Sequence, residues 1–72
     1  LIKSEQNSIV RKLVHLLPPE QREVLVLRHF GDLSFKEISK VPGVSINTAL
    51  GRMRYALKNI RKMIEEKQLN LQ

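Results

Sequence analysis

Cysteine is absent from the 72 residues, and glycine and proline occur only three times each. The lack of cysteine excludes disulfides and thiolate metal sites, and it fits a reducing cytosol. No apolar run reaches the roughly 20 residues that a membrane-spanning helix needs, and no signal peptide is visible. We therefore expect a cytoplasmic domain with no membrane partner. Because the first residue is Leu and not Met, we expect a fragment of a longer protein.

The sequence also lacks the patterns of an enzyme or a metalloprotein. There is no nucleophile with a recognisable base and no phosphate-binding loop. His15 and His29 have no second ligand at metal-binding spacing, so we interpret them as surface or boundary residues. Glu20 and Glu23 lie near the start of an expected helix, where the helix dipole already accounts for them. We expect a non-catalytic domain without a cofactor or a metal.

Positive charge is present in excess, with 13 Lys and Arg against 7 Asp and Glu, a net charge of +6 and a pI near 10.2. Such a balance predicts an anionic partner. The charge is unevenly distributed: residues 18–33 carry two bases against three acids, whereas residues 52–72 carry six bases against two acids. The C-terminal third is therefore the expected binding region.

Apolar residues recur at helical spacing along the chain, and no segment alternates as a strand does. We predict helices over about residues 4–16, 19–30, 35–41 and 46–67, with a frayed tail over 68–72. Pro18 and Pro19 separate the first two helices, and Gly31 is expected to cap the second. The prediction is a single all-α domain over residues 1–72, a small four-helix fold.

The third and fourth predicted helices carry strong start signals. Ser34 is followed three residues later by Glu37, which is the capping-box spacing. Pro42 ends the third helix, Gly43 permits a positive φ, and Ser45 suits the cap of the fourth. A short helix, a turn with glycine and a long second helix predict a helix-turn-helix over about residues 34–62.

The fourth predicted helix has two unlike faces. The apolar face consists of Ala49, Met53, Ala56, Leu57, Ile60 and Ile64. The opposite face consists of Asn47, Thr48, Gly51, Arg52, Arg54, Tyr55 and Lys58. Arginine pairs bidentately with guanine and asparagine with adenine, while a glycine lets the backbone approach a duplex. A helix N-terminus also offers N–H groups to a phosphate. This face predicts recognition of DNA in the major groove and not a merely solvated surface.

An ordered set of short motifs runs through about residues 17–62. In chain order it comprises Leu17-Pro18, Arg22-Glu23-Val24, Leu27-Arg28, Leu33-Ser34, Glu37-Ile38, Gly43-Val44-Ser45, Thr48, Arg52-Met53 and Ala56. This set resembles region four of bacterial RNA polymerase sigma factors, particularly the extracytoplasmic-function group. The chain departs from that pattern at Ser39, Pro42, Leu50, Gly51 and Leu57. The base preference of other members of the group therefore cannot be transferred to this chain.

The resemblance implies a monomeric domain that reads the −35 promoter element in double-stranded DNA while it holds the β flap of the polymerase core. It also implies an anti-sigma factor as a further partner. At matching positions, Gly51, Arg54 and Tyr55 read bases, and Thr48 and Arg52 grip the backbone. From side-chain chemistry and position we add Asn47 as a further base contact. We also add Ser45, Lys58 and Lys36 as further backbone contacts.

Several alternatives stay open at the level of sequence. Leu50 suits a thymine methyl, but we favour a core or interface role because it precedes Leu57 by seven residues on the same side. For Tyr55 we favour a base contact over a plain surface residue or a plug against the other helices. The effector domain of a response regulator also contains such a helix-turn-helix, but the stripe from Ala49 to Ile64 runs unbroken and favours the sigma interpretation. A protein-interaction module bound by an anti-sigma factor is a third possibility that does not exclude the first.

Overall fold

The computed structural model describes the backbone of residues 2–71 and the side chains of residues 9–66. Within the described backbone the chain forms four helices and no strand, which confirms the all-α prediction. The helices are α1 (Ile2–His15), α2 (Pro19–His29), α3 (Phe35–Lys40) and α4 (Ile46–Leu71). None of these helices combines the length and the apolarity that crossing a membrane requires.

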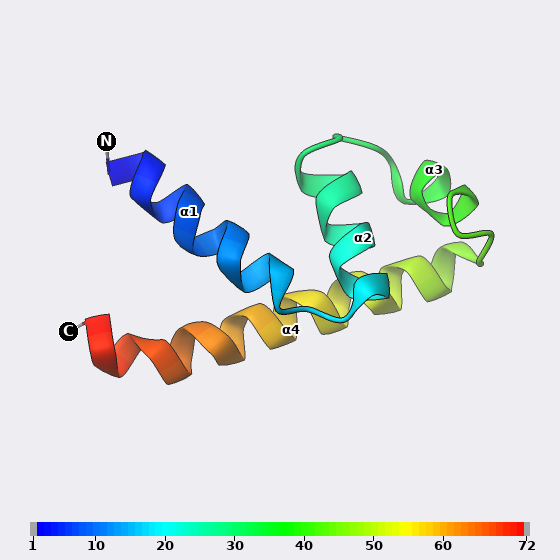
Figure 1. Cartoon of the computed structure of the whole chain (residues 1–72). Coiled ribbons are helices and arrows are strands. Elements are labelled where there is room, and N and C mark those ends of the chain that lie inside the picture. Colours follow the sequence, from blue (N-terminus) through cyan, green and yellow to red (C-terminus); the bar gives the residue numbers. More distant parts are fainter. Residues whose placement is uncertain (1, 72) are drawn as a thin grey trace.

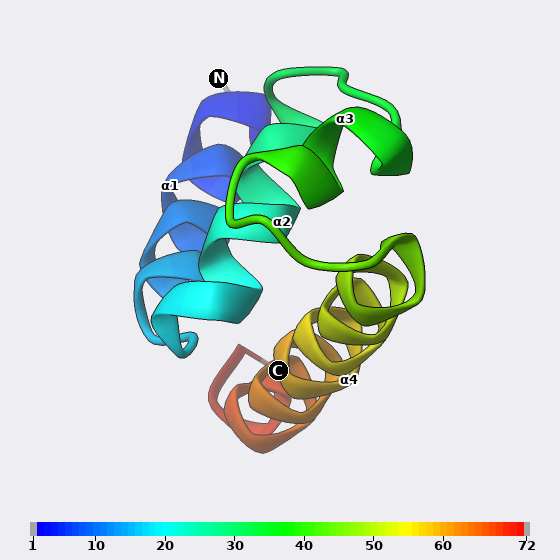
Figure 2. The same ribbon diagram turned by 90° about the vertical axis from the view of Figure 1, so that its right-hand side faces the viewer.

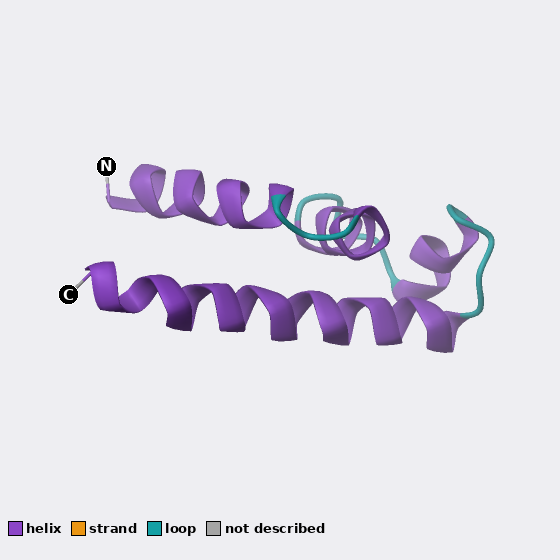
Figure 3. Ribbon diagram, turned by 60° about the horizontal axis from the view of Figure 1, so that its bottom comes forward, coloured by secondary structure: helices purple, strands orange, loops and turns teal. Residues whose placement is uncertain are grey.

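α4 is the spine of the molecule, and each of the other three helices contacts it. Its 26 residues account for about 39 Å at 1.5 Å per residue, close to the longest extent of 40 Å. α1 lies beside the C-terminal half of α4 and runs in the opposite direction, so both termini are at one end (Figures 1 and 3). α2 crosses the middle of α4, and α3 lies against its beginning (Figures 1 and 2). The start of α4 is therefore held at the end remote from the termini.

Two clusters of buried residues hold the helices together. The first contains Val14, Leu17, Leu25 and Ala56, against which Met53, Ile60 and Met63 pack. The second contains Val24, Ile38 and Ala49, with Leu27, Leu33, Phe35, Val44 and Met53 packed around it. Ala49 and Ala56 are completely buried. Alanine suits these positions because its small side chain leaves room for the neighbouring helices. Met53 takes part in both clusters and joins them.

The first helix is displaced slightly from its predicted range of residues 4–16. It begins at Ile2, because no helix-breaking residue precedes Ser4, and it ends at His15. Beyond it, the Leu16 and Leu17 amides donate to carbonyls three residues earlier, at 3.0 and 3.1 Å, in a tighter turn. Pro18 then precedes α2, whose first residue is the expected proline.

The prediction that Gly31 caps α2 is wrong in its detail. The C-cap is Phe30 in a right-handed conformation, and the residue with a positive φ, of 55°, is Asp32. Asp32 tolerates this region because its short polar side chain suits the left-handed conformation. Gly31 is required for a different reason: an added Cβ would lie 2.7 Å from the Leu27 carbonyl oxygen, a backbone atom that cannot move aside.

The last two helices also differ in length from the prediction. α3 ends at Lys40, one residue early, because Val41 serves as its C-cap before Pro42. α4 continues to Leu71, so the predicted end at residue 67 and the frayed tail are wrong for residues 68–71. No glycine or proline follows Gly51, and nothing in the sequence therefore stops the helix. Gln72 lies outside the described residues.

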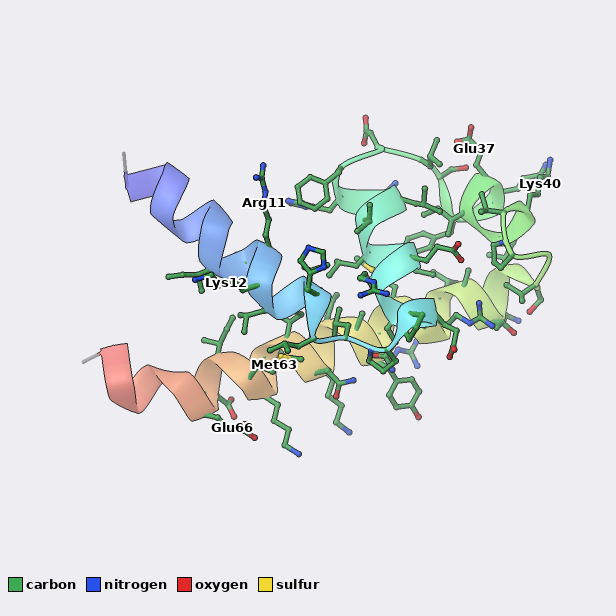
Figure 4. All side chains as sticks on the ribbon, in the orientation of Figure 1. Arg11, Lys12, Glu37, Lys40, Met63 and Glu66 are labelled. Atoms are coloured by element: carbon green, nitrogen blue, oxygen red, sulfur yellow. The ribbon has the colours of Figure 1, made fainter. Side chains whose placement is uncertain are left out.

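The buried stripe of α4 is narrower than predicted. Leu57 and Ile64 are 46% and 42% exposed, although the helical spacing assigned them to the core. Met63 takes their place: it points from α4 toward the end of α1 (Figure 4) and packs on the first cluster. The core face consists of residues 49, 53, 56, 60 and 63, because α1, α2 and α3 all contact α4 from one side. The flank that carries Leu57 is left accessible.

Candidate nucleic-acid interface

The structure contains the predicted capping box at the start of α3. The Ser34 hydroxyl accepts the Glu37 amide at 3.1 Å, and the Glu37 carboxylate accepts the Ser34 amide at 3.0 Å. Glu37 and Lys40 project from α3 at the end of the molecule away from the termini (Figure 4). The backbone and hydroxyl hydrogen bonds from Ser34 lower the pKa of the Glu37 carboxyl below its ordinary value of 4.5, with a smaller contribution from Lys40.

Acid should weaken this capping box. Because the pKa of Glu37 is lower in the folded state, the carboxylate contributes stability above pH 4.5 and loses it as the pH falls through the lower, folded-state pKa. Glu37→Gln keeps a hydrogen-bond acceptor but has no charge to titrate, so its melting temperature should depend less on pH in this range. Thermal melts followed by circular dichroism check this. Lys40→Ala removes only the smallest contribution and should keep most of the pH dependence. An identical acid response in wild type and Glu37→Gln contradicts the assignment.

The turn between α3 and α4 has the predicted conformation. Gly43 has a φ of 74°, and the Val44 amide donates to the Ser39 carbonyl at 2.9 Å. The Ser45 hydroxyl accepts the Thr48 amide at 3.0 Å, which confirms Ser45 as the cap of α4. The Ser45 and Thr48 hydroxyl groups also share a hydrogen bond, with 2.9 Å between the two oxygens. The two hydroxyl groups are therefore held together at the exposed start of α4.

The predicted DNA-contacting residues of α4 lie on its accessible surface. Five are exposed, namely Asn47, Thr48, Arg54, Tyr55 and Lys58. Gly51 and Arg52 are half-buried, and a Cβ at Gly51 would meet nothing within 4 Å, so the space in front of it is open. Tyr55 is 60% exposed, which excludes the alternative that it plugs the core. At 100° per residue, Asn47, Gly51, Arg54, Tyr55 and Lys58 lie within about 100° of one another around α4, with Thr48 beside Tyr55 and Arg52 at the edge nearest the core. Lys36 is exposed on the neighbouring helix α3.

The two arginines of this face point in different directions. Arg52 and Arg54 are two positions apart, which separates them by about 160° around the helix. Arg52 is half-buried at the edge near the core, and Arg54 is exposed on the open side. The geometry therefore supports two roles, one at the rim and one in the centre of a contact surface.

Five basic residues follow one another along the described part of α4, and then the sign of the charge changes. They are Arg52, Arg54, Lys58, Arg61 and Lys62, and Glu65 and Glu66 come next. The surface over residues 52–62 should therefore attract polyanions, whereas the acidic pair that follows it should not. His15 and His29 are exposed as predicted, and the described residues contain no group of three metal-ligating side chains.

Sequence reasoning missed the side chains that hold the helix-turn-helix in place. Arg28 donates from Nη1 to the Leu33 carbonyl at 2.9 Å, and its guanidinium lies over the Phe35 ring, 5.2 Å from the centroid. Asn59 donates to Gln21 at 2.7 Å, which joins α4 to α2 across 38 positions of sequence. Arg28 gave no helical-spacing signal, because it lies on α2 and Phe35 begins α3, with a turn between them. The Gln21–Asn59 pair had none, because two neutral polar residues so far apart show no pattern.

Arg28 should contribute to stability through both contacts. Arg28→Ala should lower the free energy of unfolding by about 1 kcal/mol, the magnitude of an exposed hydrogen bond with a cation–π contact. Arg28→Lys should recover only part, since a lysine lacks the planar fork that stacks and donates at once. A double-mutant cycle with Phe35→Leu, measured by urea denaturation, should give a coupling of about 0.5–1 kcal/mol. Arg61→Ala is the control, with a change within about 0.5 kcal/mol. Additive effects of the Arg28 and Phe35 changes would rule out the contact.

A capped helix-turn-helix whose second helix exposes an amide, a hydroxyl, guanidinium groups and an open glycine defines a helix-turn-helix DNA-binding domain. Residues 8–64 match the family model described as Sigma-70, region 4. The chain therefore belongs to the sigma-70 region 4 family. This membership decides against the response-regulator alternative.

Curated relatives agree with this assignment. The chain is 30% identical over 64 residues to RNA polymerase sigma-E factor of Streptomyces avermitilis, covering 89% of this chain and 36% of that protein. It is 34% identical over 73 residues to RNA polymerase sigma factor YlaC of Bacillus subtilis, covering 96% of this chain and 42% of that protein. The chain thus spans about two fifths of the length of these relatives. No solved structure gives a significant match.

Proposed function

We propose that this domain recognises a −35 promoter element through α4 in the major groove while it binds the β flap of RNA polymerase during transcription initiation in the cytoplasm. It acts as a non-catalytic monomer. The proposal rests on the observation that α4 has two separate accessible surfaces. Its polar side exposes Asn47, Arg54 and Lys58, and its apolar flank contributes to a groove with α1 and α2.

The groove has the character of a protein-binding site. It encloses about 180 Å³ and is lined by Val10, Val14, Leu25, His29, Phe30, Leu57 and Ile60. A neighbouring hollow shares Val14 and Phe30 with it and adds Arg11 and Arg22 at its border. Arg11 projects from α1 away from α4 (Figure 4). An apolar groove with cationic neighbours suits an apolar helix with acidic flanks, and we assign it to the flap. An anti-sigma factor that covered the groove would compete with polymerase.

DNA binding is tested first, by fluorescence anisotropy with duplexes selected from a library of randomised sites. The domain should prefer one asymmetric site and bind it as a monomer. About four phosphate contacts predict that log K falls against log salt with a slope of roughly −3 to −4. A slope near zero, or equal affinity for every duplex, would contradict recognition through α4.

Flap binding is tested by two-dimensional NMR with the isolated flap domain of an RNA polymerase β subunit. Shifts should concentrate on the groove and leave Thr48 and Arg54 unchanged. Phe30 is 57% exposed, so Phe30→Ala should weaken flap binding without unfolding the domain or altering its affinity for DNA. Leu16→Ala is the matched control, because Leu16 is 62% exposed and does not line the groove. If no shifts occurred at high flap concentration, the proposed binding of the β flap would be contradicted.

A further inference from the structure

Leu50 is an apolar side chain at the edge of a polar face. It is 38% exposed, and neither buried cluster includes it, so the expectation that it widens the core is wrong. It also does not line the apolar groove, although Leu57, seven residues later, does. Neither the core nor the groove therefore accounts for Leu50.

Two of the four neighbours of Leu50 on the helix surface are residues that suit base recognition. Positions three and four apart are adjacent on a helix, which places Leu50 next to Asn47 one turn earlier and Arg54 one turn later, with Ile46 and Met53 on its other side. Asn47 and Arg54 are exposed, and Ile46 is 44% exposed. These residues belong to the first turns of α4, and the N-terminal part of a recognition helix is what contacts base edges in this class of fold.

Among the base edges of the major groove, the C5-methyl group of thymine is the distinctive apolar one. We infer that Leu50 contacts a thymine methyl group and makes this domain select thymine at one position beside the base read by Arg54. The inference rests on the proposed function, since it requires α4 to lie in the major groove. A leucine cannot donate or accept a hydrogen bond there, so its contribution to specificity comes from burying the methyl group together with its own exposed surface.

The experiment removes the methyl group alone. Each thymine of the preferred site, on either strand, is replaced in turn by deoxyuridine, which keeps every hydrogen-bonding group of the base. Binding of the wild-type chain and of Leu50→Ala is measured by anisotropy at one salt concentration. At one position the replacement should weaken wild-type binding about fourfold, which corresponds to one buried methyl group. Leu50→Ala should bind the two duplexes equally.

Leu16→Ala is the matched control and should lose affinity on the deoxyuridine duplex as the wild type does. Because Leu50 is exposed and alanine favours helices, the variant should fold, as circular dichroism can verify. If every replacement affects wild type and Leu50→Ala by the same factor, Leu50 does not contact a thymine methyl and the inference fails while the proposed function stands. If no duplex is preferred at all, both fail.

Discussion

Ile38→Ala is expected to cause the largest loss of stability among single changes to the helix-turn-helix. Ile38 is completely buried on α3 and packs with Val24 of α2 and Ala49 of α4. Truncation of such a side chain leaves a cavity between three helices and costs about 2–5 kcal/mol. A domain of this size has a total stability on the order of 4–11 kcal/mol. Urea denaturation at equilibrium measures the change.

Two matched variants separate this effect from a general sensitivity of α3. Ile38→Val removes one methylene group and should cost about 0.5–1.5 kcal/mol. Val41→Ala, at the end of the same helix, changes a side chain that is 56% exposed and should cost less than about 0.5 kcal/mol. DNA affinity of Ile38→Ala should fall together with the folded fraction, since α3 and α4 are joined through this cluster. If Val41→Ala destabilised the domain as much as Ile38→Ala, the second cluster would not be what holds α3.

Arg54→Ala is expected to have the largest effect on DNA recognition. Arg54 is exposed on the open side of α4, where a guanidinium group can pair bidentately with a guanine. Its loss should cost about 1–3 kcal/mol on the preferred site and relax base preference at a single position. Competition anisotropy with duplexes that differ at each position measures both quantities.

Arg52→Ala is the informative comparison. Arg52 lies at the rim of the face, half-buried, and points about 160° away from Arg54. It should act on a phosphate, so its removal should weaken binding to all sequences alike and reduce the magnitude of the salt slope by about 1. If both variants lose the same affinity on every sequence, the two arginines do not have separate roles.

The helices and the turn of the helix-turn-helix could be predicted from short-range sequence signals. The capping box at Ser34, the turn at Gly43 and the cap at Ser45 each depend on groups within a few residues of one another, and the structure contains all three. The exposed position of Arg54 and Tyr55 followed from helical periodicity. Their roles toward bases remain predictions, because no sequence pattern contains the partner.

Errors arose where the outcome depended on what lies next to a helix. Periodicity assigned Leu57 and Ile64 to the core, yet both are exposed, because the other helices cover only one side of α4. Leu50 is exposed too, which excludes a core role, whereas the interface role that was also favoured for it is not tested by the fold. Gly31 was expected to cap α2, whereas Phe30 is the C-cap, Asp32 has the positive φ, and Gly31 is required by the nearby Leu27 carbonyl.

The sequence by itself thus determined four helices, a capped helix-turn-helix and the exposed basic face of α4, because caps, turns and periodicity act over a few neighbouring residues. Only the tertiary structure decided which flank of α4 stays accessible, that Met63 completes the core, and that Arg28 and the Gln21–Asn59 pair hold the motif in place. Those outcomes depend on how α1, α2 and α3 pack, and packing between distant residues is a property of the assembled fold.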